Sequence, residues 1–261
     1  MSDFEGLNVQ WCGDHVVLVE ICRPPTNFFD VELIKQLADV FDVMEQDDRC
    51  RAVVLAAQGR VFCAGADFSG GGAGLFDEAS ENNALSLYQE AMRLYKFSKP
   101  IVGAIQGPAI GGGLGLALVP DFRVVCHEAR FAANFVQLGV HPGFGISLVL
   151  PNLIGQQNAK LMLLTGRRIK GEEALRFGLA DLLVDVGEVR SAAIKLATEI
   201  SQCAPLAVES TRSTMRRGLT EQLMSHLEHE FAEQVRLAKT QDHNEGMKAV
   251  AERRLGAFQR A

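Results

Sequence analysis

The sequence predicts an α/β fold that ends in a helical region. Strand-like apolar runs and helical stretches alternate as far as Val186, and from Glu188 onward the hydrophobic spacing is helical throughout. A third observation is the glycine turn within Pro108–Leu118, which joins an apolar run to an Ala/Leu-rich segment. Strands alternating with helices and then helices alone predict an α/β core, residues 1–187, and a helical appendage, residues 188–261.

The first part of the chain begins with two strand-like runs, Val9–Cys12 and Val16–Cys22, which predict a hairpin. A helix should begin after Asp30, a suitable N-cap, and Ala52–Ala57 should form a strand. The stretch Ser69–Asn83 is glycine-rich and then acidic. We expect a loop there that serves as a lid over a site.

The remaining strands and helices follow from the same patterns. Strands are predicted at Ile101–Ile105, Phe122–Cys126, around Phe131 and at Leu182–Val186, with helices between them at Asn158–Leu164 and Glu172–Phe177. The helical appendage should contain Val189–Ile200, Leu206–Met215, Leu219–Leu237 and Asn244–Leu255.

Composition narrows the class of protein. With 261 residues and 48% hydrophobic content, the chain can bury a substantial core. A net charge of −6 argues against nucleic acid or an anionic membrane as the main partner. No apolar run approaches the ~20 residues that span a bilayer, and the acidic N-terminus does not resemble a signal peptide. The six cysteines are scattered without metal-ligand spacing, so we expect a cytoplasmic protein with buried thiols and no metal.

The glycine turn has chemistry of its own. Gly111, Gly112 and Gly113 stand where a strand passes into a helix, so a ligand can approach the backbone closely. The first N–H groups of the helix have no partner within it and can hold a phosphate or a developing oxyanion. Tight packing of the helix on its strand would also require glycines, and this stretch alone leaves both interpretations open.

Five blocks in the same order resemble the enoyl-CoA hydratase/isomerase (crotonase) superfamily. They are Arg23-Pro24-Pro25-Thr26-Asn27, Phe62 to Asp67, Gly107 to Gly113, Leu164 to Arg168 with Glu173-Ala174, and Glu245-Gly246 with Glu252-Arg253-Arg254. The resemblance implies a spiral of ββα units and a C-terminal helical region that assembles homotrimers, often paired into hexamers. It also implies an acyl-CoA thioester as substrate, with coenzyme A present as part of the substrate and not as a separate cofactor.

The resemblance assigns roles to particular residues. The backbone N–H groups of Ala66 and Gly112 would polarise the thioester carbonyl. Contacts to coenzyme A would come from Arg23, Pro25, Ala64, Asp67 and Phe68, and from Arg253 and Phe258 toward the nucleotide of a neighbouring subunit. Arg253 on a terminal helix also suits a solvated face, and Asp67 can instead bond the local backbone.

Two acids that the hydratases of this family use are absent here. The position of the first glutamate is Gly115, and that of the second is Phe135. Neither side chain transfers a proton, so ordinary hydration is in doubt. By resemblance, Gly115 and Phe135 remain in contact with the substrate, and the Gly143 N–H occupies the position that holds the reacting water.

His141 is then the titratable residue that the sequence places nearest the chemistry. A pKa near neutrality suits a general acid or base, although the ring can also pack under its turn and bond a carbonyl. The acidic residues of the expected lid, Asp77, Glu78 and Glu81, are alternatives. Two other features predict no site: His226, His229 and Glu230 lie on a polar helix face, and Cys63 has no histidine near it in sequence.

These observations predict an acyl-CoA-processing lyase or isomerase that stabilises a thioester enolate. An alternative is a decarboxylase or C–C hydrolase acting on a CoA ester, in which bond cleavage itself generates the enolate. A third hypothesis, of a different class, is a non-catalytic acyl-CoA-binding subunit that kept the fold and lost the acids.

Overall fold

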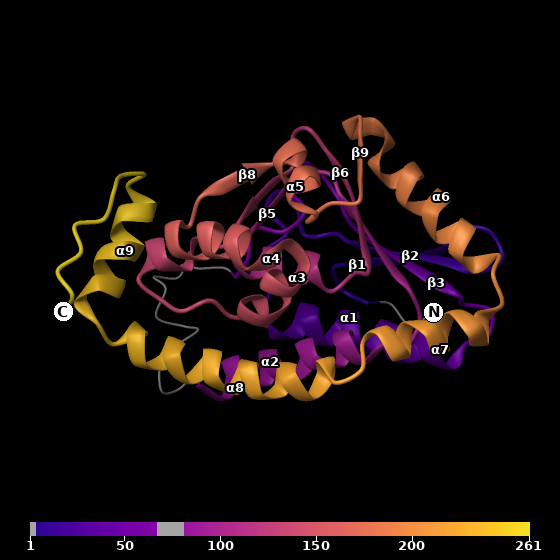
Figure 1. The fold of residues 1–261 in the computed structure, drawn as a ribbon, viewed down its shortest axis with the longest axis horizontal. Helices are drawn as coiled ribbons and strands as arrows, with labels where there is room; N and C mark the ends of the chain where they lie inside the picture. The colour runs from indigo at the N-terminus through magenta and orange to yellow at the C-terminus, as the bar shows by residue number, and fades with distance from the viewer. Residues whose placement is uncertain (1–3, 67–80) are drawn as a thin grey trace.

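The computed structural model describes residues 4–66 and 81–261, with side chains in the second range described from Leu87 onward. Within these residues the main sheet has six strands in the order β1-β2-β3-β4-β6-β9 (Figure 1). They are β1 (Leu7–Trp11), β2 (Val16–Ile21), β3 (Ala52–Ala57), β4 (Ile101–Ile105), β6 (Phe122–Cys126) and β9 (Leu182–Val184). The hairpin pair β1 and β2 is antiparallel, and every other pair is parallel. Strands β2, β3 and β4 are buried along their whole length, as their continuous apolar sequences require in a parallel sheet.

A second, smaller sheet carries the glycine turn. It contains β5 (Pro108–Ile110), β7 (Arg130–Ala132) and β8 (Arg168–Lys170). Strands β5 and β7 are parallel, and β7 and β8 are antiparallel. The register places Ile110, Ala132 and Arg168 in one row across the three strands. This row lies directly before the turn that opens α3 (Gly112–Leu118).

Helices cover the sheets and form the outer part of the molecule. The other helices of the core are α1 (Val31–Gln46), α2 (Glu81–Lys96), α4 (Ile146–Thr165) and α5 (Gly171–Phe177), with the 3₁₀ turns η2 (Asn134–Leu138) and η3 (Val186–Glu188). The C-terminal helices are α6 (Val189–Ser201), α7 (Pro205–Met215), α8 (Leu219–Ala238) and α9 (Gln241–Ala251). Figure 1 shows α6 to α9 following the edge of the molecule, with α8 lying along α2. Helix α6 packs across β2, β3, β4 and β6.

The mixed α/β architecture predicted from the sequence is confirmed. The predicted hairpin and the strands at Ala52–Ala57, Ile101–Ile105 and Phe122–Cys126 all form. Asp30 caps α1, since its Oδ1 accepts a hydrogen bond of 2.8 Å from the Leu33 amide. Among the described residues no helix is long and apolar enough to cross a membrane.

Several elements differ from the prediction. The helix expected at Asn158 begins at Ile146, because Pro151 and a non-helical Gly155 (φ 77°, ψ 156°) obscure its periodicity. Strands β5 and β8 were not predicted, since each is only three residues long. The last helix covers Gln241–Ala251 and not Asn244–Leu255.

Another difference concerns the expected lid, Ser69–Asn83. Helix α2 already begins at Glu81, so the loop cannot extend to Asn83. Asp67, Phe68, Asp77 and Glu78 lie outside the described residues, and the side chain of Glu81 is not described. The predicted roles of these five residues therefore stay predictions.

Candidate functional site

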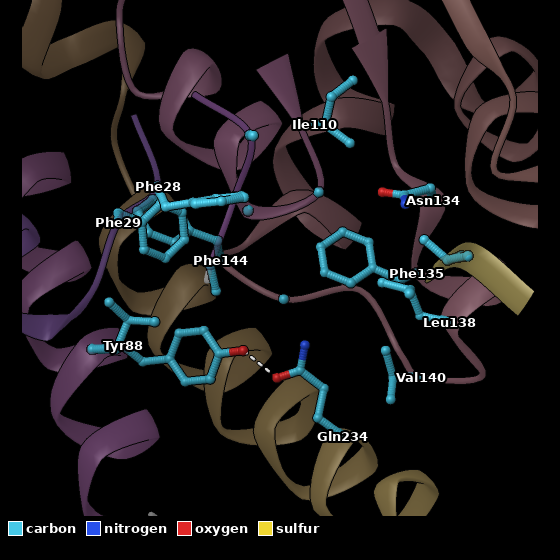
Figure 2. Close-up of a pocket in the computed structure, with 18 of the residues that line it drawn as sticks. Phe28, Phe29, Tyr88, Ile110, Asn134, Phe135, Leu138, Val140, Phe144 and Gln234 are labelled. Atoms are coloured by element: carbon cyan, nitrogen blue, oxygen red, sulfur yellow. Dashed lines mark hydrogen bonds between the residues drawn. The ribbon is translucent and has the colours of Figure 1, made fainter. Parts of the chain in front are cut away.

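A cavity of about 500 Å³ lies where the glycine turn, the Ala64–Ala66 loop, η2 and helices α2 and α8 meet. Figure 2 shows its wall, to which Phe28, Phe29, Phe135 and Phe144 contribute aromatic rings. The described lining residues include no Asp, Glu or His. Their polar side chains are Tyr88, Asn134, Arg168 and Gln234.

Close packing brings the loop at Ala64–Ala66 onto the glycine turn. The Ile110 amide donates a 3.0 Å hydrogen bond to the carbonyl of Cys63, and any side chain on Gly113 would collide with the same carbonyl. A methyl group on Gly65 (φ 92°) would lie 2.9 Å from the Ile110 carbonyl oxygen and 3.5 Å from the Gly112 nitrogen. Glycine is required at both positions for this approach. The structure therefore has the tight packing that was the alternative explanation for the glycines of the turn. This packing brings Gly65 close to the amide of Gly112.

Three backbone amides at the cavity have no acceptor. The N–H groups of Ala66, Gly112 and Gly143 donate to no group within the described parts of the chain. All three residues line the cavity. Gly112 is the first residue of α3, where the N–H has no partner inside the helix. Donors left open in this way are available to an oxygen atom of a ligand.

Aromatic rings occupy the space at Phe135 and beside Gly115, the two positions to which the family resemblance assigns glutamates. Phe135 lines the cavity itself. At the other position, a methyl group on Gly115 would lie 2.6 Å from Cβ and 2.9 Å from Cγ of Phe144. Phe144 has a φ of 63°, which is rare for a bulky side chain, and its ring packs 5.6 Å from that of Phe29. The space a carboxylate would need beside Gly115 is therefore filled.

Tyr88 and Gln234 form a polar pair that sequence reasoning missed. The Tyr88 hydroxyl donates to Oε1 of Gln234, as the dashed line in Figure 2 shows, and Nε2 of Gln234 donates a 2.9 Å bond to the His141 carbonyl. Burial raises the pKa of Tyr88, so its hydroxyl stays protonated. The two residues lie 146 positions apart in the sequence, so no local sequence pattern predicts their contact.

His141 lies beside the cavity wall and not among the lining residues. Its Nδ1 is 2.8 Å from the Pro142 carbonyl oxygen, and its ring meets that of His229 edge to face at 5.7 Å. The neighbouring Gly143 does line the cavity. This geometry matches the packing alternative given for His141 above.

Glu230 has a structural role that corrects its assignment to a polar helix face. Its carboxylate is fully buried and accepts hydrogen bonds from the Gly145 amide (2.8 Å) and from the amide and hydroxyl of Ser147 (3.0 and 2.5 Å). Burial raises the pKa of this carboxyl. These donors belong to the N-terminus of α4, where a carboxylate is favourable. Glu230 therefore holds the turn that carries Gly143 and Phe144.

The residues expected to contact coenzyme A are dispersed. Ala64 lines the cavity, whereas Arg23 pairs with Asp30 at 2.9 Å and Pro25 does not line the cavity. Arg253 and Phe258 are exposed near the C-terminus. Cys63 is fully buried, and burial raises the pKa of its thiol to about 12, as expected of an inert thiol.

Comparison with known proteins gives consistent likenesses. The family model for enoyl-CoA hydratase/isomerase matches residues 12–261. A probable mitochondrial enoyl-CoA hydratase 2 of Arabidopsis thaliana is 32% identical over 246 residues, covering 92% of this chain and 80% of that protein. The short-chain-enoyl-CoA hydratase of Clostridium acetobutylicum is 32% identical over 248 residues, with 92% of each chain covered.

Solved structures agree with the sequence comparisons. The crystal structure of an enoyl-CoA hydratase/isomerase from Pseudoalteromonas atlantica superposes with a TM-score of 0.85 at 28% identity, covering 97% of this chain and all of that one. An enoyl-CoA hydratase from Mycobacterium avium also gives a TM-score of 0.85, at 27% identity. The fold expected from the five sequence blocks is confirmed by these likenesses.

Proposed function

This chain belongs to the enoyl-CoA hydratase/isomerase family, the crotonase superfamily, and we propose that it binds an acyl-CoA thioester and stabilises the thioester enolate. The amides of Ala66 and Gly112 would donate to the thioester oxygen as negative charge develops on it. The observation that carries the proposal is that both amides line one cavity and have no acceptor among the described residues. Preorganised donors of this kind act without reorganisation at the moment of reaction.

Because no acid is found among the described lining residues, the two-glutamate route of hydration is a poor fit. With Phe135 at one expected position and Phe144 packed beside Gly115 at the other, no carboxylate stands at either position to activate water. We assign proton transfer to a group outside the described wall: His141 after its ring leaves Pro142, or one of Asp77, Glu78 and Glu81. Of these, His141 alone has a described side chain, and its Nδ1 is engaged.

The apolar wall supports a second candidate, decarboxylation or C–C cleavage of a CoA ester. In decarboxylation the electron pair of the broken C–C bond passes into the thioester, carbon dioxide leaves, and the enolate then takes one proton at carbon. This step needs no carboxylate base, and an apolar surrounding destabilises the charged leaving group before it reacts. Crotonyl-CoA hydration and carbon dioxide release from malonyl-CoA distinguish the two candidates. A chain that binds both esters and turns over neither would be the non-catalytic subunit.

Removing one amide tests the oxyanion hole. Because any side chain on Gly112 would collide with the Phe29 ring, the test uses a Phe29→Leu background. In it, Gly112→Ala keeps the N–H and Gly112→Pro removes it, at the first position of a helix, where proline is tolerated. We expect the proline variant to lose about 100- to 1,000-fold in turnover relative to the alanine variant. Equal rates in two variants with the same circular dichroism spectrum would refute the oxyanion hole.

We propose further that the helical region, residues 188–261, assembles homotrimers or hexamers, as the family resemblance implies. The support in this chain is a set of apolar side chains left exposed on it. They include Leu206 and Met215 of α7, which are 79% and 83% exposed.

A further inference from the structure

The polar groups of the cavity are mostly donors, and its one described charge is positive. Ala66, Gly112 and Gly143 each present an unpaired N–H. Arg168, an exposed residue of β8, adds a guanidinium to the lining and makes no ion pair with any described residue. A thioester carbonyl can occupy two of these donors and leaves the rest without an acceptor. The surplus therefore points to a second acceptor group on the substrate.

Asn134 provides another donor whose hydrogen-bonding capacity is unused. Its Oδ1 is buried without a partner, and its Nδ2 donates to no described residue while not being among the fully buried atoms. A methyl group on Gly111 would lie 3.5 Å from Oδ1, so the oxygen faces the backbone of the glycine turn. Figure 2 shows the amide of Asn134 between Ile110 and Phe135. The Nδ2 of Asn134 is therefore a donor that is free to bind an acceptor atom of a ligand.

The small sheet places Arg168 at a useful distance from the oxyanion donors. Ile110, Ala132 and Arg168 form one row across β5, β7 and β8. Two strand spacings separate the outer members, about 10 Å between their backbones. Gly112 follows Ile110 by two residues, and Asn134 follows Ala132 by two. A short acyl chain held at Gly112 and directed along this row would pass Asn134 and approach Arg168.

We propose that the acyl group of the substrate carries a carboxylate, which Arg168 and the Nδ2 of Asn134 bind. Arginine binds carboxylates through paired, charge-assisted hydrogen bonds, and the lining has no described acid to compete for it. This inference rests on the proposed function, because it takes the thioester to be held at Ala66 and Gly112. It names the substrate class as the CoA thioesters of dicarboxylic acids.

Matched pairs of ligands test the proposal in the intact protein. Dissociation constants are measured by calorimetry for malonyl-, glutaryl- and adipyl-CoA and for propionyl-, pentanoyl- and hexanoyl-CoA, which have the same chain lengths without the carboxylate. Mass spectrometry checks that each ester stays intact. We expect at least one dicarboxylic ester to bind about 10- to 100-fold more tightly than its partner, as a charge-assisted hydrogen bond provides.

The variants identify which part of the ligand Arg168 contacts. Arg168→Met keeps the aliphatic stem and should abolish the preference, whereas Arg167→Met, an exposed neighbour outside the lining, should keep it. Asn134→Leu should reduce the preference, and Asn134→Gln should restore part of it. Thermal unfolding confirms that each variant is folded.

Three results would overturn the inference. They are the absence of any preference in the unmodified protein, a preference that survives Arg168→Met, and an equal loss for all six esters. An equal loss would mean that Arg168 contacts a phosphate of coenzyme A and not the acyl group. None of these results affects the proposed oxyanion hole, which fails only if the Gly112 variants behave alike.

Discussion

At the residue scale, aromatic rings occupy the two places to which the family resemblance assigns acids. Phe135 itself stands at the second place. At the first, Phe144 fills the space beside Gly115 with its backbone in the left-handed region. Such a conformation costs about 1–3 kcal/mol and persists where the surroundings hold it. Glu230 helps to keep Phe144 in this conformation, because its carboxylate accepts a hydrogen bond from the next amide, that of Gly145.

Restoring the first glutamate alone should therefore fail. We expect Gly115→Glu to destabilise the protein by about 1–3 kcal/mol through overpacking against Phe144 and to gain no crotonyl-CoA hydration. Combining it with Phe144→Ala should cost less than the sum of the two single changes, because the alanine makes room for the carboxylate. Urea unfolding of the two single variants and the double variant measures this coupling. Strictly additive losses would show that the Phe144 ring does not occupy the site.

The absence of acids at Gly115 and Phe135 is a prediction that rests on the family resemblance, which assigns each position to a local motif. The sequence does not predict what fills their space. Phe144 meets Gly115, Glu230 meets Ser147 and Tyr88 meets Gln234 across 29, 83 and 146 residues of chain. Contacts at such separations depend on how the helices pack, and hydrophobic periodicity carries no information about which side chains then face one another.

At the element scale, the strands were the easiest to predict, because a fully buried strand is a short apolar run bounded by polar residues. Helix ends were harder. The end of α9 depends on Arg253, whose φ of 54° starts a left-handed cap. The Arg254 amide then donates to the Ala249 carbonyl at 3.0 Å and the Arg253 amide to that of Val250 at 3.2 Å. Because the left-handed residue is an arginine and not a glycine, the sequence does not indicate that the helix ends here.

The segment after α9 folds back onto the helix through two carboxylates. Glu245 binds Arg254 and accepts a 2.8 Å hydrogen bond from the Ala257 amide. Asp242 accepts hydrogen bonds of 2.6 and 2.8 Å from the amides of Gln259 and Arg260. Residues 252–261 are not helical, but these hydrogen bonds hold them against α9.

Acid should release this segment. The hydrogen bonds from Arg254 lower the pKa of Glu245 from 4.5 to about 2. A carboxyl with a lowered folded pKa stabilises the bound segment fully above pH 4.5, and this stabilisation declines as the pH falls and is lost below about 2. We expect hydrogen-exchange protection of the Ala257 amide, corrected for intrinsic rates, to fall across this range.

The control substitutions remove or keep the titrating group. Glu245→Gln should leave Ala257 poorly protected already at neutral pH and insensitive to acid in this range. Glu221→Gln, at an exposed position on α8, should behave like the unmodified protein. Protection of Ala257 that is the same in all three proteins would show that Glu245 does not hold the segment.

At the scale of the whole molecule, the C-terminal helices leave apolar surface uncovered. A groove of about 630 Å³ runs between β6 and helices α6 and α7, and its lining includes Phe122, Ile200, Val208 and Met215. Phe122 and Met215 are 37% and 83% exposed. Side chains of this kind gathered along one groove are typical of a surface that another protein covers. Since the proposed function includes assembly of identical subunits, we take a second copy of this chain as the occupant.

A charge placed in this groove should break the assembly. We expect light scattering after size-exclusion chromatography to give the mass of a trimer or hexamer for the unmodified protein and of a monomer for Met215→Asp, because an interface does not bury an unpaired carboxylate without a large cost. Ser213→Asp adds the same charge to an exposed position of α7 outside the groove and should leave the mass unchanged. If Met215→Asp is folded and keeps the full mass, the subunits associate through another surface. If the unmodified protein is itself a monomer, the helical region does not assemble copies, and the cavity of a single chain must bind the whole thioester.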